Sequence, residues 1–162
     1  MLSRRADYGV RAMLDVALQS SENRSIVSEI AERQHIPAYF LAKIVPKLAH
    51  AGLLRTSLGA SGGVALGMPA DKISLLQIIE AIDGPLMLNL CSLEPSGCAC
   101  SGNCPALDVW CRAQTQLNRT LAQTRLGDLI ASRQKVAPRS KARKHQNLAK
   151  VKNLRKVEQL RG

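Results

Sequence analysis

The chain has 162 residues, a length that suits one globular domain or one compact domain with an appendage. Hydrophobic residues make up 46% of the chain and aromatic residues only 2%, so its core must consist of Leu, Ile, Val, Ala and Met, a composition that favours helices. The net charge is +11, but residues 133–162 hold eleven Lys or Arg against one acid and so carry +10 of it. Residues 1–132 therefore carry only +1, and their net charge does not predict a surface that binds polyanions.

Three helices are expected in the first third of the chain. Residues 3–20 place apolar side chains on one broad helical face, with charged residues left for other surfaces. Ser25 or Ser28 can cap a second, short helix. Pro37 stands where a first-turn proline is tolerated and begins the third helix, which Gly52 ends as a C-cap. Two short helices joined by a tight turn make a helix-turn-helix.

A β-hairpin is expected directly after these helices. Residues 53–56 and 64–66 have the character of strands, and the glycine-rich residues 59–63 form the tip between them. Without the hairpin, an ordinary helical hairpin would be the better interpretation of the two short helices. With the hairpin as a wing, residues 1–84 are predicted to form a mainly α, winged helix-turn-helix DNA-binding domain, completed by a helix over residues 75–82 that Ser74 can cap.

The cysteines mark the next segment, a loop expected over residues 85–104. All of them lie between residues 91 and 111, and Pro and Gly residues between them allow the backbone to wrap round a small object. A metal ion or a metal cluster is the natural object. The cysteines are Cys91, Cys98, Cys100, Cys104 and Cys111.

Three chemistries are open to these thiols. Residues 1–20 have no apolar secretory core, and no apolar run is long enough to span a membrane, so a cytoplasmic protein is expected and structural disulfides are disfavoured. Zinc usually shows paired Cys knuckles, whereas Cys98, Cys100 and Cys104 give at best one poor knuckle with no His in the stretch. Ligand softness and compartment favour an iron–sulphur cluster; zinc and free or redox-active thiols are the alternatives.

A single long helix is predicted over residues 105–132, because apolar residues recur along it at helical spacing. Such a long, lightly charged helix in a small protein requires a partner, so we expect a dimerisation helix and hence a homodimer. The alternative is that this helix folds back on its own domain. Residues 133–162 form a basic tail with too little apolar material for a core, and we expect disorder there, with helix formation on contact with DNA or a partner.

The third helix is the candidate for DNA recognition. If its apolar residues face inward, Tyr39, Lys43 and Lys47 face outward, as do Pro37 and Ala38 at its start. A helix placed in the major groove presents such residues to base edges and phosphates, although a solvated helix face is the alternative. The candidate DNA-binding residues are Arg4, Arg5, Ser28, Pro37, Ala38, Tyr39, Lys43, Lys47, Arg55 and Ser61. No phosphate-binding loop, catalytic carboxylate pair or Cys–His pair is present, so an enzyme is not expected, and a redox carrier using the same cysteines is a weaker alternative.

Several motifs together resemble a known family. They are Ala6-Asp7-Tyr8-Gly9-Val10-Arg11-Ala12-Met13, Ile30-Ala31-Glu32, Phe40-Leu41-Ala42-Lys43-Ile44, Leu48-x3-Gly52-Leu53, Gly62-Gly63-Val64-x-Leu66-Gly67 and the cysteine loop. Over about residues 1–130 the chain resembles the iron–sulphur winged-helix transcription regulators of the IscR, NsrR and RirA family. The resemblance implies a repressor that binds a double-stranded DNA operator and senses nitric oxide, iron or cluster status. It implies a cluster, 4Fe–4S favoured and 2Fe–2S possible, on Cys91, Cys98 and Cys104.

The chain also departs from this family's pattern. Leu107 stands where the cluster-biogenesis regulators have a histidine ligand, and Asp7 matches an aspartate that the nitric oxide sensors recruit across the dimer. The resemblance therefore implies Asp7 as the fourth metal ligand; an ion pair of Asp7 with Arg4 or Arg11 is the alternative. Leu58 precedes the wing glycine where the family usually has arginine. Ala42 replaces a glutamate of the recognition helix, and Cys100 and Cys111 are additional.

Overall fold

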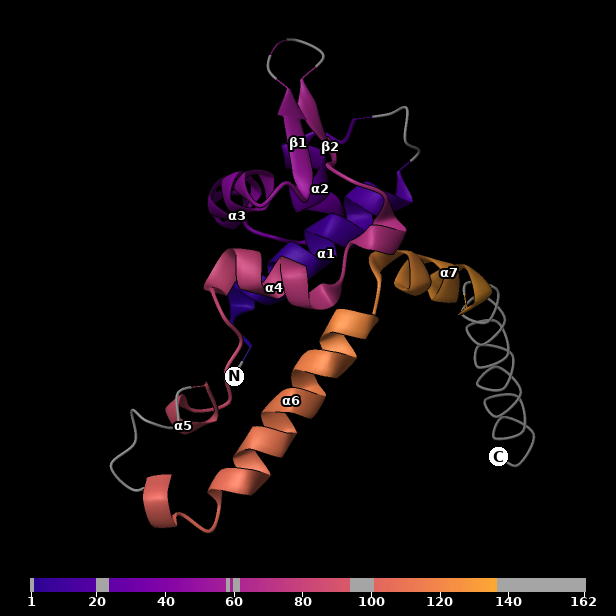
Figure 1. Ribbon diagram of the computed structural model, residues 1–162. Helices are drawn as coiled ribbons and strands as arrows, with labels where there is room; N and C mark the ends of the chain where they lie inside the picture. The colour runs from indigo at the N-terminus through magenta and orange to yellow at the C-terminus, as the bar shows by residue number, and fades with distance from the viewer. Residues whose placement is uncertain (1, 20–23, 58, 60–61, 94–100, 137–162) are drawn as a thin grey trace, which may run out of the picture. The chain divides into compact units, whose positions relative to one another are not determined.

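The computed structural model describes residues 2–19, 24–57, 59, 62–93 and 101–136. The chain divides into two compact units, Met1–Ile130 and Ala131–Gly162, and most of the predicted basic tail lies outside the described residues. The first unit is mainly helical with one two-stranded antiparallel sheet, as the sequence predicts (Figure 1). None of the described helices is long and apolar enough to cross a membrane.

Helix α1, Arg4–Leu18, is the centre of the unit. It begins at Ser3, whose hydroxyl accepts a hydrogen bond from the Ala6 amide at 3.1 Å. It packs against α2, α3, α4 and the wing, and its buried face includes Ala12, Met13 and Val16. A Cβ on Gly9 would overlap Ile82 Cδ1, so glycine is what allows α1 to approach α4 so closely.

Helices α2, Val27–Gln34, and α3, Ala38–His50, form the predicted helix-turn-helix. The turn between them is tight because His35 adopts a left-handed conformation, with φ of 51°. The apolar residues of α3 enter the core as the periodicity predicts, and Gly52, at φ of 72°, follows the end of the helix.

The prediction that Ser25 or Ser28 caps α2 is wrong. Ile26 holds the cap position and makes no side-chain capping bond, and Ser28 lies inside the helix. Ser25 instead exchanges two backbone hydrogen bonds of 2.9 Å with Val64 in the wing. The backbone of Ser25 therefore forms an isolated antiparallel bridge to β2, and the helix begins after it.

The wing consists of β1, Leu54–Ser57, and β2, Gly63–Leu66. Its antiparallel register pairs Leu54 with Leu66 at the base and Ser57 with Gly63 at the outer end. The hairpin leads into a short 3-10 helix, η1, Ala70–Lys72, and then into α4, Leu75–Asp83. The predicted cap Ser74 is confirmed: its side chain and that of Gln77 form a reciprocal capping box.

The predicted single helix over residues 105–132 is two helices, α6, Leu107–Gln123, and α7, Leu126–Val136. The break occurs because the chain pairs with the segment before α4: Thr124 accepts from the Leu75 amide at 3.0 Å, and Leu126 donates to the Ile73 carbonyl at 2.8 Å. The side chain of Leu126 is fully buried in the core. Helical periodicity continues across the break, so the sequence pattern did not reveal it.

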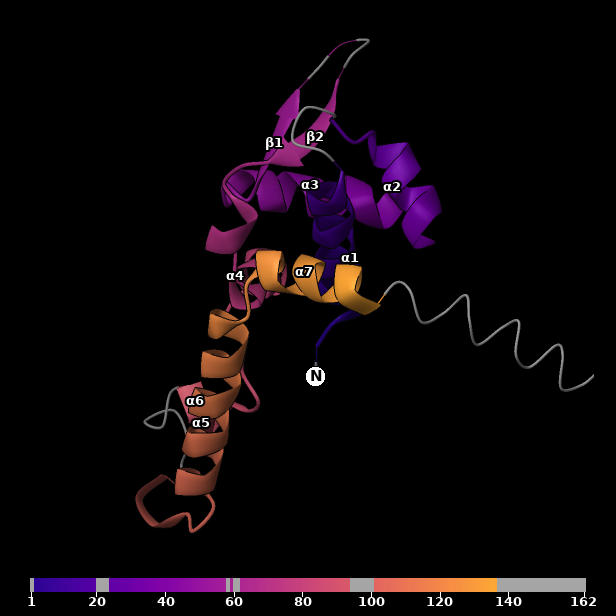
Figure 2. The same ribbon diagram turned by 90° about the vertical axis from the view of Figure 1, so that its right-hand side faces the viewer.

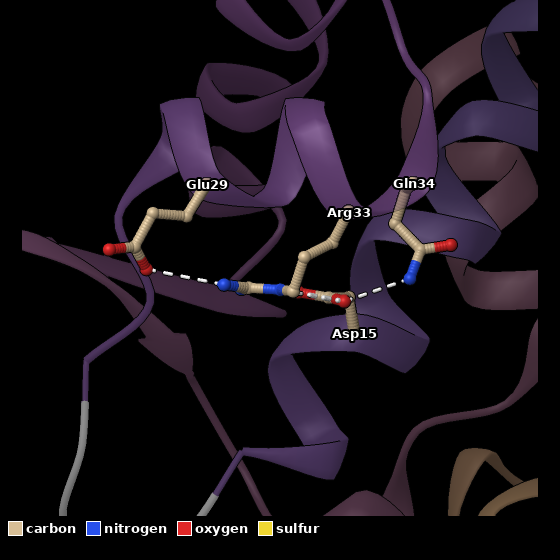
Figure 3. A network of polar contacts seen from close by, with 4 residues as sticks. All are labelled: Asp15, Glu29, Arg33 and Gln34. Atoms are coloured by element: carbon tan, nitrogen blue, oxygen red, sulfur yellow. Dashed lines mark hydrogen bonds and ion pairs between the residues drawn. The ribbon is translucent and has the colours of Figure 1, made fainter.

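A buried ionic network joins α1 to α2 (Figure 3). The Asp15 side chain is only 5% exposed, although its place in the helical pattern put it among the surface residues. Arg33 donates to both Asp15 oxygens, the shortest contact being 2.7 Å, and Gln34 donates to Oδ1 at 2.8 Å. The hydrogen bonds that Arg33 makes with Asp15 raise the pKa of Arg33, and burial acts in the opposite direction. Protein hydrogen-bond donors therefore replace the water molecules that would otherwise solvate this carboxylate.

Removing the guanidinium should destabilise the unit. Arg33→Met keeps the apolar stem but leaves the Asp15 carboxylate buried and short of donors. We expect urea unfolding to show a loss of about 2–4 kcal/mol, towards the low end for buried pairs because water reaches Arg33. The control is Glu29→Gln, which removes only the exposed i,i+4 pair with Arg33 and should cost at most about 0.5 kcal/mol. Equal losses in the two variants would contradict the assignment.

Candidate functional sites

The exposed face of α3 is the first candidate site. The buried residues of α3 are Leu41, Ile44, Val45 and Leu48. In contrast, Tyr39 is 60% exposed, and Lys43 is exposed one turn later. The Tyr39 ring lies against the ring of Phe40, with 4.3 Å between centroids, and Phe40 meets Tyr8 edge to face at 5.0 Å. Aromatic contacts with α1 thus hold the start of α3 in place. Pro37 and Ala38 are also exposed there.

Lys47 is exposed, as the sequence predicts, but its amine has a partner within the protein. Its Nζ donates a hydrogen bond to the Ile82 carbonyl in the last turn of α4. A cation at this end of a helix is favourable because the last carbonyls lack helical partners. The amine of Lys47 therefore helps to hold α3 against α4. Within the part of the chain that the structure describes, the side chain of Lys43 makes no such bond.

The other candidate DNA-binding residues are spread over several elements. Arg4 and Arg5 are exposed at the start of α1, where Arg5 forms an ion pair of 3.5 Å with Asp83. Ser28 is exposed in the first turn of α2. Arg55 is exposed on β1 and donates to the Leu66 carbonyl at 3.3 Å. Ser61 lies outside the described residues.

Asp7 shows the contact that was the alternative to metal binding. Its carboxylate lies 3.7 Å from the Arg11 guanidinium at i,i+4 spacing, and its side chain is 56% exposed. Arg11 also donates to the Gln34 carbonyl and stacks over the Tyr8 ring. An exposed pair of this length contributes at most about 0.5 kcal/mol, so it leaves the carboxylate accessible to another partner.

The second candidate site is the cysteine arm, which we define as residues 86–93 and 101–123 with α5, η3 and α6. Cys91 lies in α5, Leu90–Leu93, and Cys104 follows the 3-10 helix η3, Ser101–Asn103. Both thiols are free and partly exposed, and Cys91 donates to Asn89 Oδ1 at 3.4 Å. Cys98 lies outside the described residues, and the described ones alone bring no three potential metal ligands together. Free thiols at both edges of the loop suit a soft metal or a cluster.

Gln114 connects the two sides of this arm, a role that the sequence pattern did not predict. It is the buried residue of α6: its Oε1 accepts from the Leu88 amide at 2.7 Å and its Nε2 donates to the Leu86 carbonyl at 2.8 Å. It also donates to Asn118 Oδ1 at 2.8 Å. The segment that leads to Cys91 is thereby fixed to α6. A polar residue in the middle of an apolar helical stripe was the available signal.

Apolar side chains remain exposed around the arm. Val109 and Trp110 on α6 are 52% and 42% exposed, and Leu90 on α5 is 67% exposed. α6 packs against α4 and α5. Figure 2 shows the wing and α6 at opposite ends of the unit, with α4 between them. The arm therefore carries uncovered apolar surface away from the face of α3.

Similarity to known proteins agrees with this arrangement. The family described as Rrf2, iron-dependent transcriptional regulator, matches residues 2–132. The transcriptional regulator IscR of Aliivibrio salmonicida is 31% identical over 133 residues, 82% of this chain and 79% of that protein. Among solved structures, CymR, the global cysteine regulator of B. subtilis, has a TM-score of 0.67 at 27% identity, covering 82% of this chain and 97% of that one. IscR of T. potens has a TM-score of 0.64 at 26% identity, covering 82% and 87%.

Loss of the Gln114 amide should loosen the start of the cysteine loop. Gln114→Leu keeps the shape of the side chain but leaves the Leu88 amide and the Leu86 carbonyl unpaired, a loss of about 1–3 kcal/mol. Hydrogen exchange should accelerate over residues 86–93 and stay unchanged in α1. Gln116→Leu, at an exposed position of the same helix, is the matched control. Unchanged exchange over residues 86–93 would show that Gln114 does not anchor the loop.

Proposed function

Since the chain belongs to the Rrf2 family of transcriptional regulators, we propose that it is a repressor that binds a double-stranded DNA operator as a homodimer, under the control of an iron–sulphur cluster. The observation that carries DNA recognition is the division of α3 into a buried apolar face and an exposed face with Tyr39 and Lys43. Placed in the major groove, the exposed face brings a phenol and an ammonium group to base edges and phosphates. The wing then reaches the neighbouring groove.

The apolar surface of the cysteine arm supports the homodimer. Val109 and Trp110 lie in the first turn of α6, where exposed apolar side chains are costly unless a partner covers them. A second copy presents the same surface, so an isologous contact buries both sets at once. Two copies of α3 are then held at a fixed spacing, which successive major grooves of an operator require.

The proposed cluster ligands are Cys91, Cys98 and Cys104. When bound, a 4Fe–4S cluster, or a 2Fe–2S cluster as the less favoured type, supplies a site that reacts with nitric oxide or is lost when iron is scarce. Asp7 is proposed as the fourth ligand, contributed by the partner copy. A carboxylate is a hard donor among soft thiolates, so this ligand exchanges readily, which suits sensing. The weak ion pair with Arg11 supports this role because little is lost when Asp7 leaves it.

A chain of contacts supports communication from the cysteines to α3. Gln114 fixes the segment before Cys91 to α6, and α6 packs on α4. Lys47 then fixes α3 to the last turn of α4. A rearrangement of the loop would therefore displace α6 and α4, and with them the spacing of the two recognition helices. A shift of a few kcal/mol between competent and incompetent spacings, roughly two to three decades in their ratio, is a sufficient switch.

The cluster hypothesis predicts how cysteine variants behave. Protein purified without oxygen should be brown and contain iron, and Cys91→Ser, Cys98→Ser or Cys104→Ser should each remove the iron and the colour. Cys100→Ser and Cys111→Ser are the matched controls and should retain both. A colourless protein that holds zinc would contradict the sensor and support a zinc-stapled DNA-binding protein.

Asp7→Ala should assemble a cluster with altered absorption and faster reaction with nitric oxide. Glu32→Ala, which removes another exposed acid, should leave both the absorption and the reaction rate unchanged.

Recognition by α3 is tested with Tyr39→Ala and Lys43→Ala. Each should weaken binding to the operator by about 1–3 kcal/mol if the residue contacts a base, while iron content stays unchanged. Anaerobic binding titrations give the dissociation constants. Lys47→Ala is the informative comparison, because its amine bonds to Ile82 and its loss should lower unfolding stability as well. Operator binding unaltered in Tyr39→Ala and Lys43→Ala would place recognition on another element.

A further inference from the structure

The outer part of the wing has no cation of its own. Residues 56–66 contain no Lys or Arg, and Arg55 lies near the base of the hairpin, paired with Ala65 and bonded to the Leu66 carbonyl. An element that approaches the phosphate backbone gains little affinity without a positive charge. The outer part of the hairpin therefore supplies no positive charge of its own for binding DNA.

Arg24 brings a positive charge to this place from outside the hairpin. Because Ser25 exchanges two backbone hydrogen bonds with Val64, the preceding residue is carried along the free edge of β2. The Arg24 Nη1 donates to Ser57 Oγ at 2.6 Å, and Ser57 belongs to the outermost pair of the described wing, opposite Gly63. A Cβ on Gly63 would lie 3.1 Å from the Arg24 Cβ, so glycine makes room for this approach.

The surroundings of Arg24 leave its charge available. The residue is exposed, and among the described residues no carboxylate forms an ion pair with it. A guanidinium has five N–H donors, and the neutral hydroxyl of Ser57 accepts from one of them. The hydroxyl orients the side chain along the wing without neutralising it, and the remaining donors can bind a phosphate in the bidentate geometry that favours arginine.

We propose that Arg24 is the DNA-binding cation of the wing and binds the phosphate backbone beside the groove that the wing enters. This inference rests on the proposed DNA-binding function. It assigns to the segment before α2 a positive charge that the outer part of the hairpin does not contain. The alternative is that Arg24 only fastens the segment before α2 to β1, in which case its loss would affect stability and not the electrostatics of binding.

The experiment uses the full-length protein, and its probe is a duplex that the wild type selects from a randomised pool. Dissociation constants are measured over a series of KCl concentrations for wild type, Arg24→Ala and Arg24→Lys. Lys72→Ala, at an exposed lysine of η1, is the control with the same loss of charge. Urea unfolding of each variant provides the second readout.

We expect Arg24→Ala to raise the dissociation constant about tenfold, as loss of a charge-assisted hydrogen bond does. The slope of log affinity against log salt should become shallower by about 0.9 for each phosphate that the variant no longer neutralises. Arg24→Lys should retain most of the slope, because a lysine still carries the charge, and Lys72→Ala should match the wild type. Unfolding should be unchanged in all three variants.

Two results would overturn this inference alone. In the first, Arg24→Ala binds the selected duplex with the same affinity and salt slope as Lys72→Ala. In the second, Arg24→Ala weakens binding with an unchanged slope and a loss of unfolding stability, which identifies a purely structural role. A wild-type protein that selects no duplex from the pool would overturn the proposed function, and this inference with it.

Discussion

The Asp15 carboxylate, buried between α1 and α2, sets the position of the second helix and thereby of both elements proposed to reach DNA. A carboxylate removed from water is tolerated only when donors replace the lost hydration, and Arg33 and Gln34 do so from the last turn of α2. Once α2 is fixed there, the tight turn at His35 directs α3. At its other end, α2 is preceded by the segment that pairs Ser25 with the wing.

A second set of polar contacts ties the cysteine arm to the same core. The extended residues around Thr124 pair with the segment before α4, and Leu126 fills the core next to them. α4 is therefore held at its start by this pairing and at its end by the amine of Lys47. Such contacts are directional, so they transmit a displacement better than apolar packing alone, which can slide. In the proposed regulator, α4 is the element through which the cysteines act on α3.

Charge is distributed between two parts of the protein with different consequences. The basic tail holds nearly all of the net charge and suits attraction to any nucleic acid, since counterion release does not depend on sequence. The first unit is almost neutral, so its few cations must be placed by the fold. Lys43 on α3 and Arg24 beside the wing are placed in this way. Specific binding would then depend on geometry and non-specific binding on composition.

The sequence by itself determined the features whose causes are local. Helical periodicity located the core face of α3, and Ser74 and Gly52 marked helix ends. In each case the signal and the structure it predicts lie within a few residues, so backbone preference or spacing decides the outcome.

Only the tertiary structure decided the features whose partners are distant in the chain. Asp15 was assigned to a surface by its helical position, but it is buried and bonded to Arg33, 18 residues away. Lys47 is exposed as predicted, and only the fold brings its amine to the Ile82 carbonyl, 35 residues away. Ser25 has a side chain that can cap a helix with one hydrogen bond. Its backbone instead forms two hydrogen bonds with the backbone of Val64. The break between α6 and α7 likewise follows from pairing with Ile73 and Leu75. The local sequence pattern limits the contacts that a residue can make. The partner that tertiary packing places beside the residue then determines which of these contacts it makes.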